Sequence, residues 1–128
     1  MPDAAPLLIV LVGGIVGGVA RYAVSGFVAR RIGETFPWGT LVVNISGSFA
    51  IGLLAAWLGA HAAGGSIWIA AAVGVLGSYT TVSSFSLQTL ALARDGEWLL
   101  VVQNVLLSLA LCLGAAFAGI VAGAALWA

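Results

Sequence analysis

Hydroxyl side chains gather in one short stretch of an otherwise apolar chain. Residues 77–86, GSYTTVSSFS, carry seven hydroxyls in ten positions. A hydroxyl both donates and accepts hydrogen bonds, so this stretch has the chemistry to solvate an anion or a cation. Hydroxyls also compete for backbone groups, and glycine costs about 1 kcal/mol relative to alanine inside a helix. We therefore predict a helix break near Gly77 to Thr81, where unwound backbone would present carbonyls to cations and amides to anions.

The residues around this break indicate which ions it suits. No carboxylate lies near it in the sequence, so a metal there would depend on neutral oxygens, which favours a monovalent hard cation over a divalent one. Phe85 has a positive ring edge that can face an anion, although ordinary core packing is the alternative interpretation of this residue.

Two polar stripes run along other apolar segments. Thr40, Asn44 and Ser48 follow one another at four-residue spacing, which places them on one helix face. A second set has the same spacing and comprises Asn104, Ser108 and Cys112. Buried polar groups in a membrane are costly unless they have partners. Each stripe therefore predicts either hydrogen bonds that only hold helices together or a track that solvates a permeating species.

The composition decides which elements must position these residues. Of the 128 residues, 62% are apolar and 6% charged, which is typical of an integral membrane protein. The uncharged segments are long enough for spanning helices of about 20 residues. The segment HAAGGS, residues 61–66, supplies a turn within the longest of them. We predict an all-α integral membrane protein with a single four-helix domain over residues 1–128, its helices lying at about 6–28, 38–59, 66–92 and 98–126.

The first of these helices is expected to belong to the mature protein, because Asp3 stands where a signal peptide carries basic residues. Small residues at four-residue spacing, as in Gly13/Gly17 and Gly119/Gly123, predict close helix packing in lipid. Four helices can hardly surround an aqueous path alone, so a transport role implies an oligomer.

Several function classes are disfavoured by what the sequence lacks. The single cysteine, Cys112, excludes an internal disulfide, and His61 stands alone in a predicted loop, so an enzyme is not expected. A net charge of zero gives no reason to expect nucleic-acid binding. A small multidrug-type exporter would need a carboxylate within the membrane, and the four predicted helices contain none. A structural subunit of a membrane complex stays open as a second alternative, but it would leave both stripes without a purpose.

Three blocks of the sequence resemble the signature blocks of a known family, the small fluoride channels called Fluc or CrcB. They are GGIVGGVARY (13–22), WGTLVVNISGSFAIG (38–52) and GVLGSYTTVSSFS (74–86). The order and spacing are similar to those of the family, and the resemblance covers nearly the whole chain. It implies a fluoride-selective channel in the inner or plasma membrane that exports fluoride passively and confers fluoride resistance.

The resemblance also implies an assembly and a set of site residues. The expected assembly is an antiparallel dual-topology dimer with a broken third helix, two fluoride pathways and a structural sodium held by the backbone carbonyls of Gly77 and Thr80. Asn44 matches the pore asparagine of the family, Phe85 a pore phenylalanine and Arg21 the vestibule arginine. The remaining pathway positions implied in this way are Thr40, Thr81, Val82, Ser83, Ser84, Gln88, Ser108 and Cys112.

The chain departs from the family pattern in ways that bear on conduction. Val82 stands where a second phenylalanine is usual, Gln88 where an acid commonly follows, and Cys112 where a hydroxyl is frequent. Fluoride needs a path of closely spaced hydrogen-bond donors that replace its water without binding it too tightly. A buried lysine would trap the anion, and the chain contains no lysine.

The arginines are unevenly distributed for a protein that inserts in both orientations. All four fall at one pair of predicted helix ends, which predicts that both termini lie outside. A heterodimer with an oppositely biased paralogue is therefore an alternative, and a homodimer is the favoured prediction.

Overall fold

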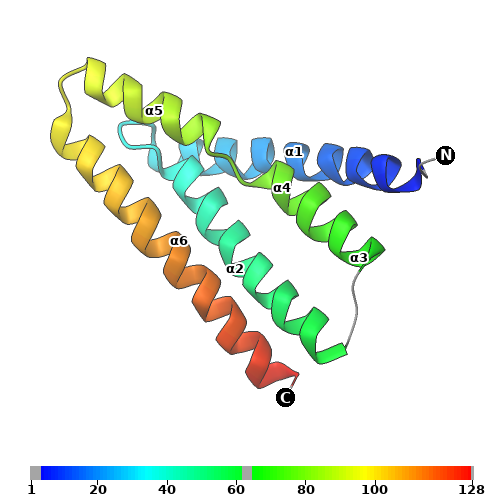
Figure 1. The fold of residues 1–128 in the computed structure, drawn as a ribbon. Helices are drawn as coiled ribbons and strands as arrows, with labels where there is room; N and C mark the ends of the chain where they lie inside the picture. Colours follow the sequence, from blue (N-terminus) through cyan, green and yellow to red (C-terminus); the bar gives the residue numbers. More distant parts are fainter. Residues whose placement is uncertain (1–3, 62–64, 128) are drawn as a thin grey trace.

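The computed structural model describes residues 4–61 and 65–127. All regular structure within these residues is helical, and four helices are long and apolar enough to cross a membrane (Figure 1). The predicted all-helical chain with four membrane spans is confirmed. The spans are Ala5–Ile32, Trp38–Ala60, Ala70–Arg94 and Trp98–Leu126.

Helix α1, Ala5–Ile32, is longer than the predicted 6–28. It ends where Gly33 takes a φ of 98°, a conformation that glycine adopts without strain, and the Gly33 N–H bonds to the Ala29 carbonyl at 2.8 Å. Arg30 and Arg31 therefore lie in the last helical turn and not in the following connection. The exposed carbonyls of a helix C-terminus favour cations at this position.

Helices α2, Trp38–His61, and α6, Trp98–Leu126, form the most extensive contact between elements and lie side by side (Figure 1). Glycines make this approach possible. A Cβ added to Gly52 would overlap the Ala116 carbonyl, and one added to Gly119 would overlap the Phe49 carbonyl. His61, predicted in a loop, is instead the last residue of α2. Most of the predicted turn that follows it, residues 62–64, lies outside the described residues.

The third span consists of joined pieces. They are the short helix α3 (Ser66–Trp68), the π-helix η1 (Ile69–Leu76), the short helix α4 (Gly77–Tyr79) and helix α5 (Ser83–Arg94). Residues 80–82, which we call the joint, connect α4 to α5 (Figure 1). Thr80 is extended, with φ −77° and ψ 157°. Gly77 is helical, with φ −61° and ψ −36°, so the non-helical residues begin three positions later than the sequence suggested.

The two halves of this span have different neighbours. The first half packs on α1, where a Cβ on Gly17 would overlap the Val75 carbonyl and one on Gly13 would come within 2.9 Å of the Ala70 carbonyl. The second half, α5, turns towards α6 (Figure 1). The joint thus lies where the span leaves α1, and it contacts α2 at Gly47.

Much of the outer surface is apolar. Large hydrophobic side chains along α1, α5 and α6 are more than half exposed, as at Leu11, Leu87 and Leu113, and Val82 of the joint is 76% exposed. Surface of this kind is expected to face lipid or another membrane protein.

Candidate functional site

The side chain of Asn44 is paired with the backbone of the joint. Asn44 Nδ2 donates to the Thr81 carbonyl at 2.8 Å, and the Thr81 N–H donates to Asn44 Oδ1 at 2.7 Å. Thr81 is only 7% exposed, so these bonds satisfy backbone groups that lie away from water. The bond to the Thr81 carbonyl uses one of the two hydrogens on Nδ2. Asn44 therefore makes the interhelical contact that was the alternative to a pore role, and its amide retains a second donor.

The Thr81 side chain organises the start of α5. Its Oγ1 accepts a hydrogen bond from the Ser84 N–H at 3.1 Å and lies 3.2 Å from Ser83 Oγ. A threonine oxygen bonded to the N–H three residues on is the geometry of a helix N-cap. The joint is thus bonded on one side to α2 and on the other to the helix that it begins.

Thr80 turns its hydroxyl away from the joint. Thr80 Oγ1 donates to the Leu76 carbonyl at 2.9 Å, and its methyl group lies against Gly47 of α2. Nearby, Ser46 Oγ and the Tyr79 hydroxyl share a hydrogen bond of 2.8 Å. Thr80 therefore offers its carbonyl, and not its hydroxyl, to any ion at the joint.

A cavity of about 340 Å³, the inner cavity, lies beside the joint. It brings together many of the predicted site residues from three spans. Its lining includes Asn44 and Ser48 of α2, Cys112 of α6, and Gly77, Thr80, Thr81 and Val82 of the third span. The two predicted polar stripes thus contribute Asn44 and Ser48 from one side and Cys112 from the other to this cavity.

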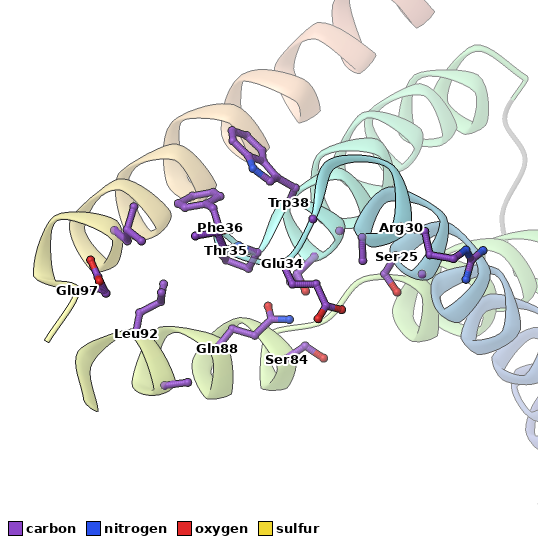
Figure 2. Close-up of a pocket in the computed structure, with 18 of the residues that line it drawn as sticks. Ser25, Arg30, Glu34, Thr35, Phe36, Trp38, Ser84, Gln88, Leu92 and Glu97 are labelled. Atoms are coloured by element: carbon purple, nitrogen blue, oxygen red, sulfur yellow. The ribbon is translucent and has the colours of Figure 1, made fainter. Parts of the chain in front are cut away.

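A second cavity of about 700 Å³, the outer cavity, lies between the end of α1, the connection to α2, and α5 (Figure 2). Its polar lining includes three predicted site residues, Thr40, Ser84 and Gln88. The N–H of Ser84, a residue of the outer cavity, donates to Oγ1 of Thr81, a residue of the inner cavity, so one hydrogen bond links the linings of the two cavities.

The outer cavity carries charge that the sequence analysis did not assign to a site. Its lining includes Arg30, Glu34, Asp95 and Glu97, and Arg30 lies at its α1 side (Figure 2). Arg21, the predicted vestibule residue, is half-buried and belongs to the described lining of neither cavity. The feature that could have pointed to Arg30 is its place in the last turn of α1. The predicted helix stopped at residue 28, whereas α1 continues to Ile32.

Gln88 extends from α5 towards the connection between α1 and α2 (Figure 2). Its Oε1 is buried and has no hydrogen-bond partner among the described residues. A buried acceptor without a partner lowers the stability of the folded protein by about 1–3 kcal/mol. The stability of the fold therefore does not explain a glutamine at position 88.

The residues of the polar stripe on α6 have different surroundings. Asn104 is 2% exposed, and its Nδ2 donates to Thr89 Oγ1 at 2.9 Å; Thr89 in turn donates to the Phe85 carbonyl at 2.7 Å. Asn104 thus holds α5, whereas Cys112 lines the inner cavity. Ser108 and Phe85 are half-buried and Ser83 is exposed, and none of the three lines either cavity. Thr89 was not singled out from the sequence.

Within the described residues, no group of three or more His, Cys, Asp or Glu could hold a metal ion. A cation at the joint would therefore depend on neutral oxygens such as backbone carbonyls.

The family model described as "CrcB-like protein, Camphor Resistance (CrcB)" matches residues 8–120. The chain belongs to the CrcB family. Relatives in this family are similar over most of their length. The protein named fluoride-specific ion channel FluC 2 of Rhodopseudomonas palustris (strain BisB18) is 56% identical over 120 residues, which are 91% of each chain. The FluC 2 of Bradyrhizobium diazoefficiens is 52% identical over 116 residues, 88% of this chain and 85% of the relative. The FluC of Opitutus terrae is 50% identical over 125 residues, 93% and 92% of the two chains.

These CrcB relatives are named as ion channels and not as enzymes. The resemblance found in the sequence is confirmed, and so is the expectation that the chain is not an enzyme. Four apolar helices and channel relatives identify a multi-pass membrane protein.

Proposed function

We propose that this chain is a fluoride-specific ion channel that lets fluoride leave the cell passively. Two observations support the proposal: the names of its CrcB relatives, and the meeting of neutral hydrogen-bonding groups from three spans at the joint. The second observation carries the argument for this chain in particular. Membrane helices rarely bury such groups without a functional reason.

The fluoride path in this proposal runs from the outer cavity to the inner cavity. It enters past Arg30, whose positive charge lies among the carboxylates of Glu34, Asp95 and Glu97 in the lining of the outer cavity. Arg21, which lines neither cavity, is kept as the vestibule residue on the family resemblance alone. The path then passes Thr40, Gln88 and Ser84 of the outer cavity, the Thr81–Asn44 pair, and Val82 and Cys112 of the inner cavity. Ser83, Phe85 and Ser108 line neither cavity and are proposed as path residues on the family resemblance alone. Hydroxyl, amide and ring-edge donors replace the water of fluoride, and because none carries a full charge, the anion is not trapped.

The proposed assembly is an antiparallel, dual-topology homodimer in the cell membrane with two such paths. The exposed Val82 and the apolar outer surface support an assembly in which a second copy covers part of this chain. The broken third helix is part of the proposal, with the joint as its break. A structural sodium at the dimer centre would be held by the carbonyls of Gly77 and Thr80 from both copies, since two carbonyls from one chain do not complete a coordination shell.

Flux from liposomes that contain the purified protein tests the proposal. We expect efflux of fluoride and no efflux of chloride under the same gradient. Replacing Asn44 or Phe85 should reduce fluoride flux while the protein still assembles as the wild type does. Equal leak of both anions, or none of either, would refute the selective channel, and unchanged flux in both variants would refute the path described here.

A further inference from the structure

Two carbonyls at the joint lose the donors that a continuous helix would give them. In an α-helix each carbonyl accepts from the N–H four residues later, so Gly77 would pair with Thr81 and Thr80 with Ser84. In this chain the Thr81 N–H donates to Asn44 Oδ1 at 2.7 Å, and the Ser84 N–H donates to Thr81 Oγ1 at 3.1 Å. Side chains have thus taken both helical donors.

The two carbonyls deprived in this way are those of Gly77 and Thr80, the pair proposed above as sodium ligands. Carbonyls that lie inside a membrane protein need a partner. A carbonyl whose N–H partner has been taken is suited to a cation, so the residues of the joint fit sodium on an observation that is independent of the family resemblance.

We propose that Asn44 and Thr81 are positioning residues for this cation site. Each withholds one backbone N–H, so that the carbonyls of Gly77 and Thr80 remain available to sodium. The inference rests on the proposed sodium site and adds the means by which the chain keeps that site open.

The contacts and burial of Asn44 and Thr81 hold their side-chain oxygens against the two backbone N–H groups. Asn44 Nδ2 also bonds to the Thr81 carbonyl at 2.8 Å, which orients the amide so that Oδ1 faces the Thr81 N–H. Thr81 is 7% exposed, so water does not compete freely for its N–H or its Oγ1. If Asn44 Oδ1 were removed, the Thr81 N–H would be free to bond to the Gly77 carbonyl. If Thr81 Oγ1 were removed, the Ser84 N–H would be free to bond to the Thr80 carbonyl. Either bond would take a carbonyl away from the sodium site.

Sodium-dependent thermal stability of the purified protein tests the inference. Sodium chloride is titrated against choline chloride at constant ionic strength, and the unfolding temperature is measured at each step. We expect sodium to raise the unfolding temperature of the wild type. Thr81→Val and Asn44→Leu should each need about fivefold more sodium for half of that rise, because one competing N–H bond of roughly 1 kcal/mol is restored. Thr81→Ser keeps Oγ and should respond as the wild type does.

Asn104→Leu is the matched control. Like Asn44→Leu it removes an asparagine amide from a membrane span, but the buried Asn104 amide bonds to the Thr89 hydroxyl and not to the backbone of the joint. Its unfolding temperature should fall, while the sodium concentration that gives half of the effect stays at the wild-type value. Helix content is checked for every variant by circular dichroism. If Thr81→Val does not fold, the sodium concentration that gives half of the effect is compared between Thr81→Ala and Thr81→Ser. A higher concentration for Thr81→Ala supports the positioning role of Thr81 Oγ1, and equal concentrations contradict it.

The outcomes separate this inference from the proposed function. A sodium effect that persists unchanged in Thr81→Val and Asn44→Leu overturns the positioning role and leaves the sodium site standing. A wild type that does not respond to sodium overturns the site and the positioning role together. Fluoride flux, measured in separate liposomes, tests the channel function independently of both results.

Discussion

Gly47 of α2 lies directly against Thr80 of the joint, so that a Cβ at position 47 would overlap Thr80 Cγ2. The absence of a side chain is what allows the extended segment to rest on α2. Asn44, one turn earlier on the same helix, then reaches the Thr81 backbone.

Gly47→Ala should push Thr80 away from α2 and strain the Asn44–Thr81 pair. Overpacking of this kind costs about 1–3 kcal/mol, so we expect a lower unfolding temperature and reduced fluoride flux. Gly59→Ala is the control on the same helix, because a Cβ there meets no atom within 4 Å. Equal behaviour of the two variants in unfolding and flux measurements would contradict the role given to Gly47.

Val82→Phe should increase the rate of fluoride flux. Val82 lines the inner cavity, so the larger ring has room there, and its positive edge would add a favourable contact for the anion. Val82→Leu adds bulk without that edge and should leave the flux near the wild-type value. If both variants conduct equally in liposome assays, the ring edge has no part in conduction.

Modification of Cys112 should block the path. It is the one cysteine of the chain, it is partly exposed, and it lines the inner cavity. A small methanethiosulfonate reagent is expected to reduce fluoride flux in the wild type and to leave Cys112→Ser unaffected. Mass spectrometry confirms the labelling. Complete labelling with undiminished flux would place the path elsewhere.

Asn104 and Thr89 should be coupled in stability. Removing the Asn104 amide, as in Asn104→Ala, leaves the Thr89 hydroxyl without its donor, at a cost of about 1–3 kcal/mol. Because the two residues are in direct contact, the double variant Asn104→Ala/Thr89→Val should lose less than the sum of the single variants. Additive losses in unfolding experiments would show that the bond seen here contributes nothing.

Gln88→Met should not destabilise the protein. The substitution keeps the length of the side chain and removes an acceptor that is buried without a partner. Fluoride flux is nevertheless expected to fall, because the amide is lost from the outer cavity. A drop in unfolding temperature would indicate that Gln88 has a structural partner in the assembled protein.

The spans and the polar cluster could be predicted from the sequence because they depend on local properties. Hydropathy and the positions of charged residues locate four helices, and the hydroxyls of residues 77–86 mark where the third is irregular. The partner of Asn44 could not be predicted in this way. Thr81 is 37 residues away in the chain, and the polar stripe on α2 indicates a face without indicating what it meets.

The arginine of the outer cavity, Arg30, is a second feature that could not be predicted from the sequence. The sequence places both Arg21 and Arg30 near a helix end, and the choice between them depends on where α1 stops. That point is set by the backbone conformation of Gly33 and not by hydropathy. Thr89 was missed for a similar reason, since its contact with Asn104 requires α5 and α6 to fold back on each other.

The π-helix η1 accommodates one more residue per turn than an α-helix would in the same part of the third span. Its hydrogen bonds run from residue i to i+5, one residue more than in an α-helix. Deleting one residue from 69–76, such as the half-exposed Val73, would therefore favour an α-helix and leave the residues that follow facing roughly the same neighbours. A deletion within an α-helical segment instead rotates everything beyond it by about 100°. The third span thus has, just before the joint, a segment whose length can change by one residue without turning Gly77 and Thr80 away from their neighbours.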